Sequence, residues 1–296
     1  MSVEEVQEVR GADRIPAVWL VIGGILSVQS GAAIAKDLFP LVPPTALVWL
    51  RLATSAMVFL VIARPRLRGR TRADWLVALG FGVSLLVMNW AIYQSFARIP
   101  LGIAVTIEFL GPLTVAVAGS RKRSDLIWVL LAGLGVVLLG VSTTSLSLVG
   151  VLFALLAAAG WAAYILLSAQ TGKRWSGISG LAIASLVGTV VLAPPALVEA
   201  GSDLLQTKVL LLGVAVGLLS SVVPYSLELI ALRRIPARVF GILMSLEPAA
   251  AALAGLLVLG QRLGARELVA LVLVSAASLG VTLGRREGQP PVAPLE

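Results

Sequence analysis

The sequence alternates between long apolar runs and short polar connections, and this alternation limits the folds that it can adopt. The hydrocarbon core of a bilayer is about 30 Å thick, which about 20 helical residues can cross. Backbone groups in lipid must be hydrogen-bonded within the protein, so such runs form helices. Runs of this kind lie at 16–35, 44–63, 74–96, 102–119, 126–141, 149–169, 178–198, 209–231, 239–259 and 266–284. We therefore expect an all-α membrane protein with ten transmembrane helices.

The composition agrees with a membrane protein. Hydrophobic residues make up 58% of the 296-residue chain and charged residues only 13%, whereas soluble domains contain about 25% charged residues. The runs are continuously apolar and lack the alternation of a barrel strand. A net charge of +8 would suggest nucleic-acid binding in a soluble protein, but the basic residues here lie mostly between apolar runs. We expect a lipid bilayer as the surroundings and no nucleic acid as a partner.

The basic residues also indicate the orientation of the helices, because cytoplasmic connections are rich in Lys and Arg. Ten spans place both ends of the chain on one face. If that face is cytoplasmic, most basic residues fall in cytoplasmic segments, including the cluster between positions 64 and 72. We therefore expect a cytoplasmic N-terminal segment, 1–15, and a disordered cytoplasmic tail, 285–296.

Two similar segments indicate an internal duplication. Residues 97–119 read ARIPLGIAVTIEFLGPLTVAVAG and residues 233–255 read RRIPARVFGILMSLEPAAAALAG. Without gaps, they share the tripeptide Arg-Ile-Pro, a second proline and the final glycine. Each repeat, 16–141 and 149–284, would contain five helices, and an odd number reverses the orientation of the second repeat. Inverted repeats are typical of secondary transporters with alternating access and a substrate site between the repeats.

Four segments resemble the drug/metabolite transporter superfamily. They are SVQSGAAIAKDLFPLV (27–42), PLGIAVTIEFLGPLTVA (100–116), VPYSLELIALRRIP (223–236) and GILMSLEPAAAALAGLLVLG (241–260). The sequence is most similar to the EamA-type members, in the branch of bacterial inner-membrane threonine/homoserine exporters. The resemblance implies two inverted EamA repeats in the bacterial cytoplasmic membrane, and antiport of a small amino acid against protons. Many EamA proteins carry LGE where this sequence has Leu259-Gly260-Gln261, so this chain lacks that carboxylate.

Two charged residues lie within spans near the expected outer face. Ionisable residues in a membrane are costly and usually face a cavity or the helix bundle. At 1.5 Å per residue, Arg51 and Glu108 both lie roughly 9–10 Å deep. We expect them to line the substrate site, where a pair could hold the two charged ends of an amino acid. The alternatives are a bridge that orders helix packing, or an arginine that extends to the interface.

Two further glutamates are candidates for proton coupling. Glu247 lies roughly 12 Å from the inner end of the ninth span, which has no cation at that depth. A carboxyl group in an apolar medium binds a proton more readily when no cation is near, so Glu247 is the main candidate. Its alternative is a protonated carboxyl bonded to nearby backbone. Glu228 lies close to Arg233 and Arg234, where an interfacial ion pair or gate is the simpler interpretation.

Prolines and neutral polar residues complete the expected site. Pro112 and Pro248 occupy equivalent positions in the two repeats, and each removes a backbone donor and disturbs the preceding turn. We expect helix breaks there, with carbonyls free for ligands. The neutral candidates for substrate binding, which could instead stabilise helix packing, are Gln29, Ser30, Asn89, Tyr93, Trp161, Tyr164, Tyr225 and Ser226.

Alternative functions have less support in the sequence. Without cysteine or histidine, the chain lacks disulfides and the commonest metal ligands, so we expect no metal, no cofactor and no enzyme. A channel would not require the inverted repeat. Efflux of cationic drugs or other small metabolites is the main alternative, and an arginine in the cavity would favour a carboxylate-bearing substrate. Small residues in the fifth and tenth spans permit close helix contacts, which leaves monomer and homodimer open.

Overall fold

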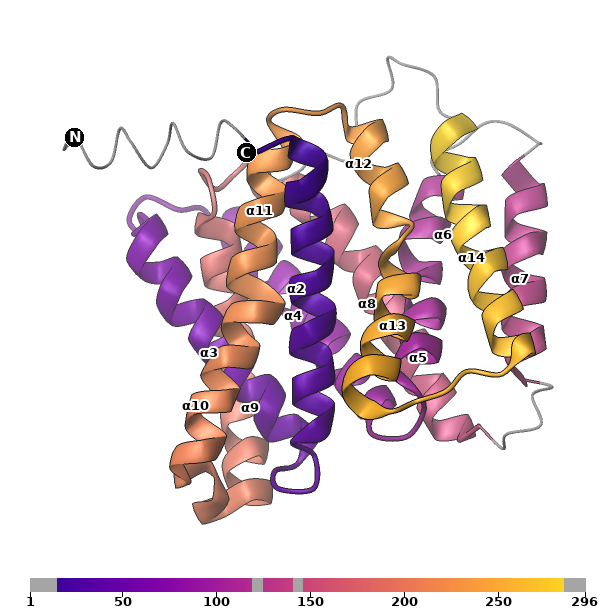
Figure 1. Ribbon diagram of the computed structural model, residues 1–296. Helices are drawn as coiled ribbons and strands as arrows, with labels where there is room; N and C mark the ends of the chain where they lie inside the picture. The colour runs from indigo at the N-terminus through magenta and orange to yellow at the C-terminus, as the bar shows by residue number, and fades with distance from the viewer. Residues whose placement is uncertain (1–14, 119–124, 141–145, 285–296) are drawn as a thin grey trace.

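A computed structural model describes residues 15–118, 125–140 and 146–284. All regular elements in these segments are helices (Figure 1). The α-helices are α2 (Ala17–Asp37), α3 (Pro44–Ala63), α4 (Arg72–Phe96), α5 (Leu101–Glu108), α6 (Leu110–Ala118), α7 (Asp125–Gly140), α8 (Leu148–Gly172), α9 (Ser179–Ala200), α10 (Thr207–Gly217), α11 (Val223–Leu232), α12 (Ala237–Met244), α13 (Glu247–Leu259) and α14 (Ala265–Gly284). A short 3-10 helix, η1 (Gly201–Leu205), follows α9, and a π-helical turn, η2 (Leu218–Val222), joins α10 to α11.

Nine helical segments in the described residues are long and apolar enough to cross a membrane. Three of these are not single α-helices: α5 continues into α6, α10 into α11, and α12 into α13. The expected span at 126–141 corresponds to α7, which is apolar but shorter than the other nine. The prediction of an all-helical, multi-pass membrane protein is confirmed at this level.

Local sequence signals explain where several helices begin and end. The Thr71 hydroxyl accepts a hydrogen bond from the Asp74 amide, and the Asp74 carboxylate accepts one from the Thr71 amide. This reciprocal cap satisfies donors at the start of α4. Pro100 and Pro236 directly precede α5 and α12, where a fixed φ and a missing donor cost little. Gly260 ends α13 with a φ of 64°, a conformation that glycine adopts readily.

Two helical spans are interrupted shortly before Pro112 and Pro248, the prolines at which we expect helix breaks. The α5–α6 span is interrupted at Phe109, and the α12–α13 span at Ser245 and Leu246. A proline inside a helix cannot donate to the carbonyl four residues earlier and its ring crowds that carbonyl. Pro112 and Pro248 therefore account for the interruptions, each of which lies two or three residues before its proline.

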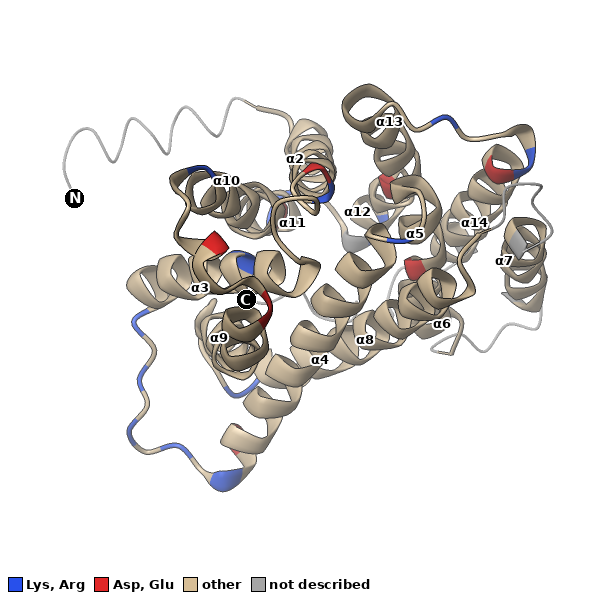
Figure 2. Cartoon of the chain, turned by 90° about the horizontal axis from the view of Figure 1, so that it is seen from below, with Lys and Arg blue, Asp and Glu red and all other residues tan. Residues whose placement is uncertain are grey.

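Helices from the first half of the chain pack against helices from the second half. α4 packs against α8, and α2 packs against α10, η2 and α11. Three further pairs are α3 with α9, α5 with α13, and α7 with α14. Figures 1 and 2 show α3, α9 and α10 on one side of the molecule and α7 with α14 on the other. The central region between these groups contains the helix breaks.

The connection between α3 and α4 is strongly basic (Figure 2). Its Arg70 donates a 2.7 Å hydrogen bond to the carbonyl of Arg174, and its guanidinium lies 4.3 Å from the ring centroid of Trp175. Arg174 in turn forms a 3.0 Å salt bridge with Asp74. These contacts attach the basic connection to the C-terminal end of α8.

Candidate functional site

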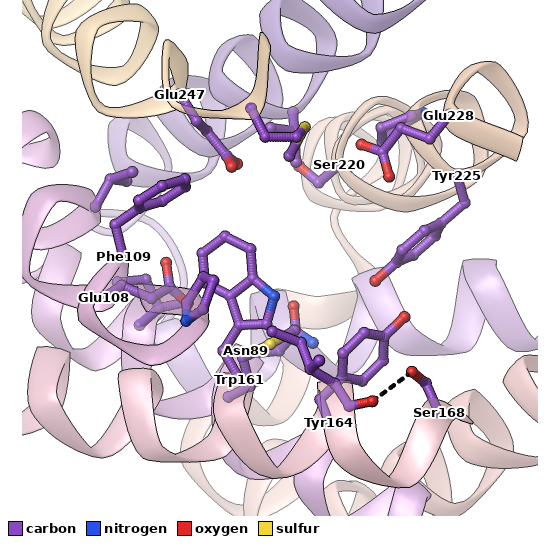
Figure 3. Close-up of a pocket in the computed structure, with 18 of the residues that line it drawn as sticks. Asn89, Glu108, Phe109, Trp161, Tyr164, Ser168, Ser220, Tyr225, Glu228 and Glu247 are labelled. Atoms are coloured by element: carbon purple, nitrogen blue, oxygen red, sulfur yellow. Dashed lines mark hydrogen bonds between the residues drawn. The ribbon is translucent and has the colours of Figure 1, made fainter. Parts of the chain in front are cut away.

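A cavity of about 440 Å³ lies between the two halves of the chain. This volume is in the usual range for small-molecule sites. The charged side chains that line it are Arg51 from α3, Glu108 from α5, Glu228 from α11 and Glu247 from α13. The close-up in Figure 3 shows the three carboxyl groups on different walls of the cavity.

Arg51 is held by the π-helical turn. Its Nε donates a 3.0 Å hydrogen bond to the Ser221 hydroxyl, and its Nη2 donates a 2.8 Å bond to the Ser220 carbonyl. Its guanidinium carbon lies 5.6 Å from the ring centroid of Tyr93. Arg51 lines the cavity. The expected ion pair with Glu108 is not formed, because the guanidinium is turned toward the π-helical turn and no carboxylate in the described residues lies within salt-bridge distance of it.

Glu247 is joined to the first span. Its Oε1 accepts a 3.2 Å hydrogen bond from Gln29 Nε2 on α2. The two remaining oxygens, Glu247 Oε2 and Gln29 Oε1, are buried and have no hydrogen-bond partner in the described protein. This pairing differs from the alternative in which the carboxyl group bonds to nearby backbone. It leaves one oxygen of each side chain without a hydrogen bond.

Glu108 and Glu228 also line the cavity. Glu108 is the last residue of α5, directly before the helix break. Glu228 projects into the cavity from α11 (Figure 3), rather than pairing with an arginine at the membrane interface. No hydrogen bond or ion pair within the described segments engages either carboxyl group.

Aromatic and amide side chains form the neutral part of the lining. Trp161 packs edge-on against Phe109 with ring centroids 5.5 Å apart, and Tyr164 stacks on Phe81 at 4.9 Å. The hydroxyl groups of Tyr164 and Tyr225 point toward one another in Figure 3. Asn89 lines the cavity while its amide donates to the Leu85 carbonyl of its own helix.

Several expected site residues lie elsewhere. Ser30 and Ser226 are exposed on the outside of α2 and α11, and the Ser226 hydroxyl donates to the Val222 carbonyl. Each directly follows a cavity residue, and one helical step rotates a side chain by about 100°, which turns both serines away. Tyr93 is fully buried behind Arg51 rather than in the lining. Pro112 lines the cavity, whereas Pro248 is buried outside its lining.

Sequence reasoning missed two serines in the π-helical turn. Ser220 and Ser221 are 2% and 3% exposed, and both contact Arg51. Ser220 also lines the cavity, and its hydroxyl has no hydrogen-bond partner in the described residues. The signal that could have found them is the pair of adjacent hydroxyl residues in the apolar run LLSSVVPY.

Close contacts hold the start of α5 against its neighbours. Gln261 Oε1 accepts a 2.9 Å hydrogen bond from the Leu101 amide, and Lys36 Nζ donates a 2.6 Å bond to the Ile99 carbonyl. A Cβ atom added to Gly102 would lie 2.8 Å from Ala252 Cα, so α5 and α13 are in close contact there. Toward the opposite face, the lining continues to Phe240 near the start of α12 and Thr282 near the end of α14.

Comparisons with known proteins identify the family. Residues 148–283 match the model of the EamA-like transporter family. The threonine/homoserine exporter RhtA of Salmonella typhimurium strain SL1344 is 43% identical over 287 residues, covering 94% of this chain and 97% of the relative. RhtA of Escherichia coli K12 is 42% identical over 284 residues, covering 94% and 96%. An uncharacterized transporter of Bacillus subtilis, YxxF, is 28% identical over 237 residues, covering 75% and 74%.

A solved crystal structure has a similar fold, with a TM-score of 0.61 and 19% identity over 90% of this chain and 96% of the other. The EamA match and the RhtA relatives confirm the family resemblance in the sequence and the expectation of a transporter rather than an enzyme. The chain is therefore a member of the EamA-like transporter family.

Proposed function

We propose that this chain exports small amino acids such as threonine and homoserine in exchange for protons. The name and the extent of the RhtA relatives support this substrate class, because the similarity covers nearly the whole chain. The observation that carries the proposal is the cavity, where a guanidinium and carboxyl groups line one space. A site with both signs of charge suits a zwitterion, and a guanidinium suits a carboxylate.

The charge balance of the cavity supports proton exchange. Three carboxyl groups and one guanidinium line it, so a surplus of carboxyl groups remains that a proton or the ammonium group of a substrate can neutralise. Isolated charges are costly in a low-dielectric interior. We propose that Glu247 is the main proton-coupling residue and that Glu228 assists it. Substrate binding would then involve Arg51 and Glu108, with neutral contacts from the cavity residues Gln29, Asn89, Trp161, Tyr164 and Tyr225.

Efflux of a lipophilic cation is the alternative that the three carboxyl groups favour. Arg51 opposes this alternative, because its guanidinium lines the same cavity and would repel a cation that had no carboxylate. The two substrate classes therefore differ in whether a negatively charged group is required.

We also propose ten transmembrane helices in two inverted repeats, 16–141 and 149–284. Counting α7 as the tenth span is supported by its packing along α14, which is itself long enough to span. The family match at 148–283 supports the boundaries of the second repeat. The two Arg-Ile-Pro tripeptides, at 98–100 and 234–236, are 136 positions apart, and so are the helix interruptions at Phe109 and Ser245.

Two helix contacts also support two repeats that are offset by 136 positions. Gly160 on α8 lies against Met88 on α4, where an added Cβ would be 2.9 Å from the Met88 amide nitrogen. Gly24 on α2 lies against Pro224 on α11, where an added Cβ would be 3.7 Å from the Pro224 Cα. Positions 24 and 160 are 136 apart, and so are 88 and 224. Exchange of two such equivalent halves is a route to alternating access.

The proposed orientation puts both termini on the cytoplasmic face of a bacterial inner membrane. The basic α3–α4 connection supports it, because cytoplasmic connections are enriched in Lys and Arg. The cavity lining then extends toward the cytoplasmic face, and the contact between α5 and α13 closes the outer face. We therefore propose that this conformation faces inward.

Transport into everted membrane vesicles tests the proposed function. Vesicles that contain the full chain are loaded to be acidic inside and are given labelled threonine, homoserine or tetraphenylphosphonium. We expect both amino acids to accumulate only while the lumen is acidic, and a protonophore to abolish the accumulation. Accumulation of the cation without either amino acid would instead support drug efflux, and failure of every amino acid would exclude the proposed substrate class.

A further inference from the structure

The π-helical turn between α10 and α11 positions Arg51. Pro224 has no N–H group and cannot donate to the carbonyl of Ser220, four residues earlier. That carbonyl accepts the 2.8 Å hydrogen bond from Arg51 Nη2, and the Ser221 hydroxyl accepts the bond from Arg51 Nε. π-helical turns often occur at functional sites. Here the turn presents two neighbouring acceptors to one guanidinium.

These two bonds leave part of the guanidinium for a ligand. Arginine has five N–H donors, and the bonds to Ser220 and Ser221 use Nε and one donor of Nη2. Arg51 Nη1 has no hydrogen bond within the described residues, and the side chain lines the cavity. A guanidinium held in this way can bind a carboxylate in a fixed orientation.

Three unsatisfied oxygens belong to residues that line the same cavity as Arg51. They are Ser220 Oγ, Gln29 Oε1 and Glu247 Oε2, in residues that are 2%, 4% and 8% exposed. All three residues line the cavity. The Gln29 amide nitrogen already donates to Glu247, so the neighbouring oxygens of this pair are acceptors. A buried polar group without a partner is unfavourable, so a ligand with several donors could satisfy these oxygens.

The wall of the cavity leaves room for the Ser220 hydroxyl. Gly31 on α2 faces Ser220, and a Cβ atom at Gly31 would collide with Ser220 Oγ. Glycine at this position lets the hydroxyl lie close to α2, the helix that carries Gln29. The serine, glutamine and glutamate oxygens therefore come from three different helical segments, η2, α2 and α13, that line the cavity with Arg51.

We propose that the cavity binds the backbone groups of an α-amino acid at two separate subsites. The substrate carboxylate binds the free donors of Arg51, and the substrate ammonium binds Ser220 Oγ, Gln29 Oε1 and Glu247 Oε2. An ammonium group has three N–H donors, which matches this set. The proposal rests on the proposed function, because it assumes an amino acid as the substrate, and it adds Ser220 as a substrate-binding residue.

Blocked substrates and one serine variant test the two subsites. Binding of threonine, threonine methyl ester and N-acetylthreonine to the purified full chain in nanodiscs is measured by isothermal titration calorimetry. We expect threonine to bind at least roughly tenfold more tightly than either blocked compound. Ser220→Ala should weaken threonine binding by roughly three- to tenfold and leave the residual binding of N-acetylthreonine unchanged, because that compound has no ammonium group.

Ser84 provides a matched control. It lies 136 positions before Ser220, is buried, and donates to the Phe81 carbonyl of its own helix outside the cavity lining. Ser84→Ala should bind all three compounds as the unmodified chain does. Equal threonine binding by Ser220→Ala and the unmodified chain would overturn the ammonium subsite. An equal loss of threonine and N-acetylthreonine would also overturn it.

Three other outcomes separate the proposals. Methyl ester binding as tight as threonine binding would overturn the assignment of the carboxylate to Arg51. If the unmodified chain neither binds nor transports any amino acid, the proposed function is wrong and this inference is wrong with it. If threonine is transported but Ser220→Ala has no effect on its binding, only the inference is wrong.

Discussion

Gln29 on α2 and Glu247 on α13 are joined by a 3.2 Å hydrogen bond from the amide nitrogen to a carboxyl oxygen, across 218 positions of sequence. The bond connects α2 to the first residue of α13, directly after the helix break. A change in the protonation of Glu247 would therefore act on a contact between helices as well as on the cavity. This arrangement gives a physical route by which proton binding can affect the relative positions of the two proposed halves.

Glu247→Gln should separate proton coupling from substrate exchange. The glutamine oxygen can still accept from Gln29, but the side chain can no longer gain or lose a proton. We expect the loss of accumulation driven by a pH gradient, while threonine–threonine counterflow without a gradient persists. Glu199→Gln, at an exposed position near the end of α9, is the control and should retain both activities. Coupled accumulation at the unmodified level in Glu247→Gln would exclude Glu247 as the coupling residue.

Arg51→Lys should weaken amino-acid transport although it keeps the positive charge. Lysine lacks the planar fork and cannot maintain both hydrogen bonds to the π-helical turn while it binds a carboxylate. We expect the KM for threonine to rise roughly tenfold. The measurement is the initial rate of uptake into everted vesicles at a series of concentrations. Arg68→Lys in the exposed basic connection should leave KM unchanged, and an unchanged KM in Arg51→Lys would contradict a binding role.

Much of the fold was predictable because membrane helices follow from local composition. A continuous apolar run must be helical in lipid whatever its neighbours are, and the effect of Pro112 and Pro248 on the preceding turn is also local. The relation of Arg51 to Glu108 was not predictable from depth. Counting residues gives the height of a side chain in the membrane but not the direction in which the helix turns it. Arg51 turns toward Ser220 because Pro224 frees a carbonyl on a helix that is 169 positions away in sequence.

The unknown rotation of each helix about its axis also explains why only some of the expected neutral residues line the cavity. Gln29 and Ser30 are adjacent polar residues in an apolar run, and so are Tyr225 and Ser226. In each pair, the first residue lines the cavity and the second is exposed and turned away from it. The choice depends on how each helix is rotated about its axis by packing against distant helices, such as α11 against α2. A single sequence without these contacts cannot distinguish the two residues.

Gly102→Ala should destabilise the closed contact between α5 and α13. The added methyl group would lie 2.8 Å from Ala252 Cα, which is backbone and cannot move like a flexible side chain. Overpacking of this kind costs about 1–3 kcal/mol. We expect a lower melting temperature in thermal unfolding of the detergent-solubilised chain. Gly133→Ala on α7, where an added Cβ meets no other atom within 4 Å, is the control and should not lower it. Equal melting temperatures for the two variants would show that α5 and α13 do not pack tightly at Gly102.

Variants of Gln261 test whether its amide fills the structural role that a carboxylate at this position could have in the many EamA proteins with LGE. Its Oε1 accepts a 2.9 Å hydrogen bond from the Leu101 amide at the start of α5, and a carboxylate oxygen could accept the same bond. Gln261→Glu should therefore retain the stability of the closed face, since a negative charge is also favourable at a helix N-terminus. Gln261→Leu has a similar size but no acceptor, and loss of such a cap costs about 1 kcal/mol.

The measurement is thermal unfolding of both variants, together with labelling of a single cysteine introduced at Ile103, which is 2% exposed near the start of α5. We expect Gln261→Leu to melt at a lower temperature and to label faster from the proposed outer face, because the bond that holds α5 beside α13 is missing. Gln261→Glu should resemble the unmodified chain in both respects. If Gln261→Leu also matched the unmodified chain, the bond to Leu101 would have no role in holding α5 beside α13, and the close packing of Gly102 against Ala252 would be the remaining contact there.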